Sequence, residues 1–164
     1  MIKKINIMIL SMFAIGNSKY APGTVASFIT SLIFIFFYFI QVNILFLILG
    51  VSTVFIFSVY SIDRFKNSFS EVDAKEIVID EFVGQSIPIL SIYSFILKND
   101  VGSFIFFVCI SFILFRFFDI IKPYPINKID KNIKNGFGVM LDDVIAGIYS
   151  SVILLIIAVF IGYE

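Results

Sequence analysis

The stretch Val139-Met-Leu-Asp-Asp-Val-Ile-Ala-Gly147 places two adjacent aspartates directly before a final run, Val144–Gly162, that contains no charged residue. A charged side chain at a membrane boundary is costly, so it is usually retained for a function. Two neighbouring carboxylates also repel each other unless a cation lies between them or one of them stays protonated. The alternative is that Asp142 and Asp143 cap the start of the last helix and face water. This stretch alone leaves both interpretations open.

The composition is that of a membrane protein. Of the 164 residues, 60% are hydrophobic and 15% are charged, and the mean hydropathy is +1.05, whereas soluble domains contain about 25% charged residues. The formal net charge is zero, so whole-chain charge indicates no nucleic-acid partner. The chain has no histidine, and its single cysteine, Cys109, lies inside an apolar run. A phosphohistidine mechanism, a cysteine nucleophile in a polar loop and an internal disulfide are therefore excluded, and a zinc site would lack its usual ligands.

Apolar runs separated by polar segments predict an all-α fold. We expect a polytopic membrane bundle of about four spanning helices with short interfacial or re-entrant helices, in a single domain over residues 1–164. Val25–Ile62 contains 38 residues without a charge, which is enough for two spans that turn near Gln41–Asn43. Phe82–Leu97 has only 16 residues and contains Pro88, so it predicts a short, kinked span. The N-terminal apolar run, Ile5–Ile15, is too short to span the membrane. Two longer apolar runs remain, Val101–Phe118 and Val144–Gly162.

The charges predict the orientation of the bundle. If the spans alternate, residues 1–24, 63–81 and 119–143 lie on one side of the membrane, with Arg116 at its edge. That side then carries 11 of the 12 lysines and arginines, and Lys98 is alone on the other. The positive-inside rule makes this side cytoplasmic. Ten of the 12 carboxylates share it, which the rule does not require, so we expect a cytoplasmic site built from both signs of charge.

A second acidic group, Asp73-Ala-Lys-Glu-Ile-Val-Ile-Asp-Glu81, precedes the short apolar run. If this segment is helical, Asp73, Glu76 and Asp80 share one face, with Glu81 beside Asp80. Three acids on one stripe favour a bound cation, and sites made only of oxygen ligands suit Mg²⁺. The alternative is a solvated acidic helix face, which is disfavoured because the sequence continues directly into an apolar run.

Two further motifs carry positive charge or glycine. Arg116 and Asp119 lie three residues apart near the end of a predicted helix and form either a structural ion pair or a phosphate clamp held by the aspartate. Lys122 would add a second positive charge to such a clamp. Gly136 and Gly138 precede the paired aspartates and allow a tight turn or a close approach to a ligand.

Four stretches together resemble the phosphatidylglycerophosphatase A family, in the order in which that family has them. The stretches are Ala21-Pro-Gly-Thr24, the segment from Asp73 to Gln85, Phe115-Arg-Phe-Phe-Asp-Ile-Ile-Lys-Pro-Tyr-Pro-Ile126 and Gly136-Phe-Gly-Val-Met-Leu-Asp-Asp-Val-Ile-Ala-Gly147. The resemblance implies an all-α, Mg²⁺-dependent lipid phosphatase of the bacterial inner membrane, which converts phosphatidylglycerophosphate to phosphatidylglycerol. The acids that it places around the metal and phosphate are Asp73, Glu76, Asp80, Glu81, Asp119, Asp142 and Asp143.

The residues and the resemblance lead to one mechanistic hypothesis. Mg²⁺ is held by four carboxylates, and a further acid, Asp73 or Glu76, orients the attacking water. Arg116, positioned by Asp119, stabilises charge on the phosphoryl oxygens. The sequence does not decide which acid is the general base. The expected metal ligands are Asp80, Glu81, Asp142 and Asp143, and the other cations for the headgroup are Lys122, Lys19 and Lys134.

Two other classes of protein are compatible with the composition. A small cation transporter would carry its carboxylates within the spans, near the midplane of the membrane. A membrane assembly subunit would tolerate the acids but gives no reason for four charged motifs to share one side. The sequence indicates no obligate protein partner.

Overall fold

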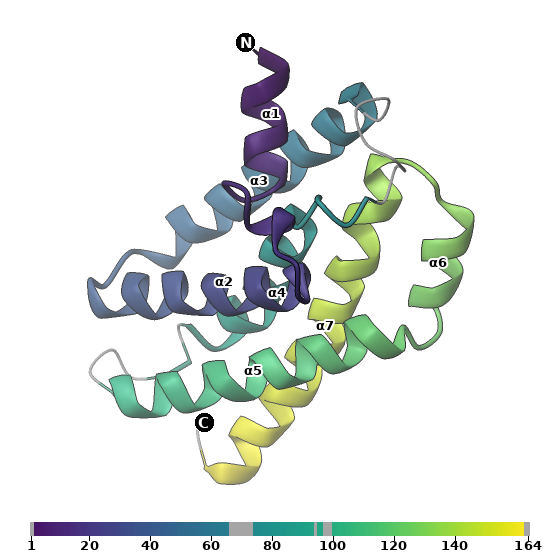
Figure 1. Cartoon of the computed structure of the whole chain (residues 1–164). Coiled ribbons are helices and arrows are strands. Elements are labelled where there is room, and N and C mark those ends of the chain that lie inside the picture. The colour runs from purple at the N-terminus through teal and green to yellow at the C-terminus, as the bar shows by residue number, and fades with distance from the viewer. Residues whose placement is uncertain (1, 66–73, 94, 97–99, 163–164) are drawn as a thin grey trace.

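The computed structural model describes residues 2–65, 74–93, 95–96 and 100–162. These residues form helices and connecting turns without a β-strand, so the all-α prediction is confirmed (Figure 1). The elements in chain order are α1 (Ile2–Leu10), the short 3₁₀ helix η1 (Ile15–Asn17), α2 (Pro22–Phe39), α3 (Ile44–Phe65), α4 (Ile79–Tyr93), α5 (Val101–Ile121), α6 (Ile126–Asn132) and α7 (Gly136–Ile161).

Four helices, α2, α3, α5 and α7, are long and apolar enough to cross a membrane. They expose large apolar side chains on their outer faces, for example Phe46 on α3 at 71% and Phe160 on α7 at 87%. Water would make such a surface unfavourable, whereas lipid tails accept it. The prediction of about four spanning helices is therefore confirmed, and the expected turn at Gln41–Asn43 lies between the end of α2 and the start of α3.

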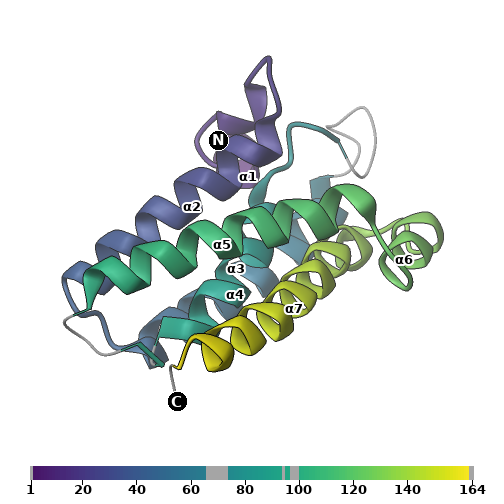
Figure 2. The same ribbon diagram turned by 90° about the horizontal axis from the view of Figure 1, so that it is seen from below.

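The short helix α4 lies inside the bundle, enclosed by α2, α3, α5 and α7 (Figure 2). Its 15 residues extend about 22 Å, less than the ~30 Å of a hydrocarbon core. Ten of the 15 are buried. Its Gln85 side chain, fully buried, donates hydrogen bonds from Nε2 to Ser31 Oγ on α2 (3.3 Å) and Ser111 Oγ on α5 (3.1 Å). These bonds tie three helices together in a region where water cannot satisfy a polar group.

The segment before α4 is not helical. Residues 75–76 form a turn, residues 74, 77 and 78 have no regular secondary structure, and the helix begins only at Ile79. The Val78 N–H donates to the Leu10 carbonyl oxygen (3.0 Å), which ties this segment to the end of α1. Glu76 and Asp80 therefore do not share a helical face. The expected acidic stripe is thus wrong for these two residues, which the structure describes. Asp73, its third member, lies outside the described residues.

The last helix begins earlier than the apolar run that predicts it. Its N-cap is Asn135, whose Oδ1 accepts a hydrogen bond from the Gly138 N–H (2.9 Å). Asp142 and Asp143 consequently lie in the second turn of α7, where they are only 6% and 4% exposed. The interpretation of this pair as a solvated helix cap is therefore wrong.

Glycines bring α4 and α7 into backbone contact. A Cβ on Gly147 would collide with the carbonyl oxygen of Gly84, and a Cβ on Gly84 would lie 2.8 Å from the carbonyl oxygen of Asp143. Both obstacles are main-chain atoms, so no side-chain rotation could relieve the collision. Small residues are the usual means by which membrane helices approach so closely.

Substitution Gly147→Ala is expected to push α4 and α7 apart, since overpacking a tight interior costs about 1–3 kcal/mol. The midpoint of thermal unfolding in detergent should fall by roughly 2–10 °C. The matched control is Gly50→Ala on α3, where an added Cβ meets no atom of another part of the described structure within 4 Å. Equal unfolding temperatures for the two variants would show that the close approach of the helices is absent.

Candidate active site

The contact between Gly84 and Gly147 positions two carboxylates. Asp80 precedes Gly84 by four residues on α4, and Asp143 precedes Gly147 by four residues on α7. Residues four apart lie on the same face of a helix, one turn away from each other. Because α4 and α7 run in the same direction, both carboxylates lie one turn before the contact, toward the same end of the bundle (Figure 2).

Three carboxylates meet at this end. Asp80, Glu81 and Asp143 each offer one oxygen, and these oxygens all lie within 4.8 Å of one another. Asp80 and Asp143 are 8% and 4% exposed. The Glu81 Oε2 atom is buried and has no hydrogen-bond partner among the described residues. Buried carboxylates at this spacing repel one another, and hard oxygen ligands are those that Mg²⁺ prefers, so the cluster could hold a divalent cation.

The pKa of Glu81 is raised to about 7, mainly because its carboxylate is buried. The nearby charges of Asp143 and Asp119 contribute in the same direction, whereas a side-chain hydrogen bond with Asp80 and the charge of Arg116 oppose the shift. The desolvated carboxylate is thus disfavoured as an anion until positive charge is supplied. A bound cation would supply that charge.

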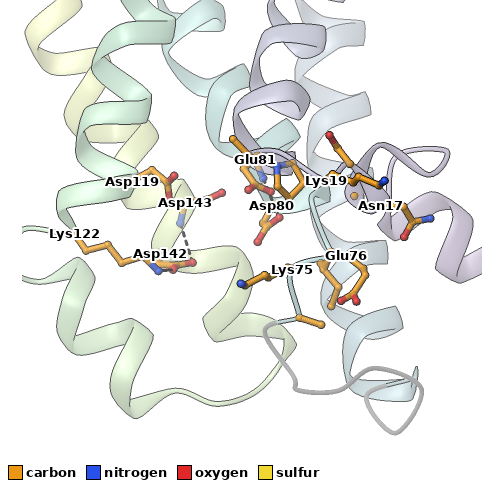
Figure 3. A pocket seen from close by; sticks show the side chains of 16 residues that line it. Asn17, Lys19, Lys75, Glu76, Asp80, Glu81, Asp119, Lys122, Asp142 and Asp143 are labelled. Carbon is orange, nitrogen blue, oxygen red and sulfur yellow. Dashed lines mark hydrogen bonds and ion pairs between the residues drawn. The ribbon is translucent and has the colours of Figure 1, made fainter.

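The carboxylates open into a cavity of about 810 Å³. Four segments far apart in the sequence line it, namely residues 16–22, 74–81, 119–122 and 142–143. Figure 3 shows Asp80, Glu81 and Asp143 near its centre, with Lys122 and Asp142 on one side and Lys19 on the other. The polar segments that were expected to share one side of the membrane therefore do meet at one end of the bundle.

Lys122, which lines the cavity, forms ion pairs with two carboxylates. Its Nζ lies 2.7 Å from Asp142 Oδ2 and 3.3 Å from Asp130 Oδ1 on α6. Partial burial lowers the pKa of Lys122, but the hydrogen bond and charge of Asp142 and the charge of Asp130 outweigh this effect and raise it above its ordinary value. The side chain therefore remains an ammonium ion. Asp142 lines the same cavity as the three-carboxylate cluster but is bonded to this lysine.

Arg116 lies behind the carboxylates and is not among the residues that line the cavity. Its Nη1 is 2.8 Å from Asp119 Oδ2, which forms the expected i, i+3 ion pair. Gly23, at the start of α2, makes room for this group, because a Cβ there would collide with Glu81 Oε1 and lie 3.2 Å from Arg116 Nη1. The Arg116 guanidinium is thus placed to offset the negative charge of Glu81 from the side that faces away from the cavity.

The remaining candidate residues are distributed unevenly. Lys19 and Glu76 both line the cavity, and both are exposed. Lys134 is exposed just before α7 and is not among the lining residues, and Asp73 lies outside the described part of the chain. Lys75 lines the cavity but was not singled out from the sequence, although it is the lone base within the second acidic group.

Comparison with known proteins identifies the family. The family model described as Phosphatidylglycerophosphatase A matches residues 8–158. The chain belongs to the phosphatidylglycerophosphatase A family. It is accordingly a phosphatase, and the four motifs quoted from the sequence all lie within the matched residues.

Relatives of this phosphatase carry two different names. Phosphatidylglycerophosphatase A of Escherichia coli is 31% identical over 154 residues, which cover 93% of this chain and 80% of that protein. Phosphatidylglycerophosphatase A of Haemophilus influenzae is 43% identical over 82 residues, which cover 50% of this chain and 45% of that protein. A protein of Bacteroides thetaiotaomicron, provisionally named a phosphatidylinositol-3-phosphatase, is 33% identical over 159 residues, 95% of each chain. No solved structure matches the phosphatase.

The purified phosphatase is expected to bind Mn²⁺, used as a spectroscopic substitute for Mg²⁺, at the three-carboxylate cluster. Asp80→Asn and Asp143→Asn should each weaken binding about tenfold or more, because each removes a charged ligand. Binding can be measured by electron paramagnetic resonance of free Mn²⁺ in detergent.

The matched control for these variants is Asp63→Asn. The exposed Asp63 carboxylate accepts a hydrogen bond from the Gly136 N–H (2.7 Å), and an asparagine oxygen can do the same while removing one negative charge. Equal weakening by Asp63→Asn would mean that Mn²⁺ responds to general charge rather than to the cluster.

Proposed function

We propose that the protein hydrolyses the terminal phosphomonoester of phosphatidylglycerophosphate, giving phosphatidylglycerol and phosphate, with Mg²⁺ at the cytoplasmic face of a bacterial inner membrane. Family membership and the names of the E. coli and H. influenzae relatives support the substrate. The observation that carries the proposal is the cluster of Asp80, Glu81 and Asp143 at the base of a cavity also lined by lysines.

The residues fit Mg²⁺ chemically. The three acids offer oxygen ligands only, and the buried Glu81 Oε2 has no hydrogen-bond partner among the described residues. When bound, Mg²⁺ would neutralise charge on the phosphate and lower the pKa of a coordinated water. Arg116, paired with Asp119, would partly offset the negative charge of Glu81 from the side away from the cavity. Glu76, exposed at the cavity, remains available to orient the attacking water.

The lysines at the cavity suit a doubly charged phosphomonoester. Lys19, Lys75 and Lys122 belong to three different segments of the lining. A phosphate that enters between them would be attracted by charge from several directions and oriented toward the carboxylate cluster. This arrangement supports a role of the lysines in binding the substrate and of the buried acids in binding the metal.

A lipid could reach the cavity from the side. Ile120 and Tyr124 flank the lining residues at the end of α5 and are 70% and 73% exposed. Exposed apolar and tyrosine side chains of this kind sit favourably at the boundary between lipid tails and headgroups. The acyl chains could therefore stay in the bilayer while the headgroup enters the cavity.

Phosphatidylinositol 3-phosphate is a second candidate substrate, because the provisional name of the B. thetaiotaomicron relative refers to it. It should be tested in the same assay. That lipid also carries a phosphomonoester on a polar headgroup, so the carboxylate cluster and the lysines would serve it equally. The two lipids differ in the size and hydroxyl pattern of the headgroup.

Purified protein in mixed micelles is expected to release phosphate from phosphatidylglycerophosphate when Mg²⁺ is present and to stop when it is chelated. Asp143→Asn should lower the rate at least ~100-fold, since it removes electrostatic stabilisation at the reacting phosphate, while the protein still inserts into membranes. Asp63→Asn is the control. Full activity of Asp143→Asn would contradict the assignment, and faster release from phosphatidylinositol 3-phosphate would change the substrate.

The cytoplasmic location of the cavity can be tested with single cysteines in a Cys109→Ser background. Asn132→Cys on α6 should react with a membrane-impermeant maleimide only after spheroplasts are permeabilised. Asn43→Cys, in the turn at the opposite end of the bundle, should react in intact spheroplasts. The reverse pattern would place the cavity on the outer face and contradict the positive-inside argument.

A further inference from the structure

The ammonium group of Lys122 lies between two carboxylates that come from different helices. It is 2.7 Å from Asp142 Oδ2 on α7 and 3.3 Å from Asp130 Oδ1 on α6. The Asp142 side chain is 8% exposed, whereas that of Asp130 is 27% exposed. The lysine thus connects Asp142, which lines the cavity, to the more exposed Asp130, which is not among the lining residues.

The backbone positions of Lys122 and of α6 are set by contacts with the rest of the bundle. Lys122 is the C-cap of α5, with φ at 46°, and its N–H donates to the Phe118 carbonyl oxygen (2.9 Å). Helix α6 is anchored by Ile126, which is fully buried in a cluster with Phe115 and Ala146. Asp130 is therefore presented to Lys122 by an anchored helix rather than by a loop.

Asp142 is placed where a cation at the neighbouring acids would also attract it. It precedes Asp143 directly, and its Oδ1 accepts a hydrogen bond from the Asp143 N–H (3.0 Å). Its Oδ2 is the atom bonded to Lys122. A divalent cation at the cluster and the Lys122 ammonium would therefore compete for the same carboxylate.

We propose that Lys122 is an internal counter-ion that occupies Asp142 in the cation-free site, and that Asp130 is a positioning residue that receives the ammonium when a divalent cation takes its place. The inference rests on the metal site of the proposed function. The exchange needs no helix movement, because Lys122 already contacts both acids. It also leaves the ammonium at the cavity edge, where a phosphate would meet it.

A purely structural ion pair would behave differently. Ion pairs close to the protein surface contribute little to stability, and α6 is already anchored by apolar contacts. A structural role for Asp130 would therefore change the unfolding temperature slightly and leave cation affinity independent of Lys122. A simple long-range charge effect would change cation affinity equally whether or not Lys122 is present.

The test is a double-mutant cycle on the full-length protein in detergent, with Mn²⁺ binding measured by electron paramagnetic resonance. Lys122→Gln is expected to tighten binding by about tenfold, because the competing ammonium is removed. Asp130→Asn should weaken binding by about tenfold, because Lys122 then bonds to Asp142 alone. In the Lys122→Gln background, Asp130→Asn should have almost no effect, which is the coupling that independent sites lack.

Two further variants strengthen the cycle. Lys131→Gln removes a positive charge from the same helix α6 and should leave Mn²⁺ affinity unchanged. Lys122→Arg keeps the charge, and because a guanidinium can bind a carboxylate through two hydrogen bonds, it should weaken Mn²⁺ binding even if Asp130→Asn fails to fold.

The outcomes separate this inference from the proposed function. If the wild-type protein binds no Mn²⁺, the metal site is wrong and the inference fails with it. If the wild type binds Mn²⁺ but Asp130→Asn has the same effect with and without Lys122, the inference alone is overturned.

Discussion

The site depends on the backbone contact between Gly84 and Gly147. Lipid tails are as apolar as leucine, so membrane helices are not driven together by the hydrophobic effect, and close packing has to be built from small residues. Here the contact holds a buried helix, α4, against α7 in one register. Asp80 and Asp143 each lie four residues before the contact, so the register of two glycines decides which carboxylates face each other. A shift by one residue would turn the acids away from the cavity.

The close packing brings a second physical problem, which is the repulsion among buried acids. Of the acids that line the cavity, Asp119 is bonded to Arg116 and Asp142 to Lys122. Asp80, Glu81 and Asp143 each place one oxygen within 4.8 Å of the others, although carboxylates repel one another. Collecting like charges is unfavourable for folding alone. The arrangement becomes understandable if the positive charge arrives with a ligand, and the fold has then been selected for binding rather than for stability.

Local patterns in the sequence predicted the long helices, the turn at Gln41–Asn43 and the segments that meet at the cavity. They failed where long-range contacts decide the structure. The segment before α4 is drawn toward α1 by the bond between Val78 and Leu10, which no helical periodicity could reveal. The N-cap Asn135 starts α7 well before the apolar run. Asp142 and Asp143 therefore lie within the helix, where they are buried, and not at its solvated start. The position of Arg116 behind Glu81 depends on space left by Gly23 on another helix, and a single sequence contains no signal for it.

The far half of the bundle argues against ion transport as an alternative use of the acids. Beyond the carboxylates, the core between the helices continues as the uncharged group of Gln85, Ser31 and Ser111. It then becomes apolar and aromatic, with Tyr38 stacked on Phe104 at 3.8 Å between ring centroids and Tyr93 packed edge-on against both. A transported ion needs polar partners along its path, because a bare charge in such a core is very costly. Within the described residues, the acids thus line a cavity at one end of the bundle, and the core beyond them offers an ion no such charged partners.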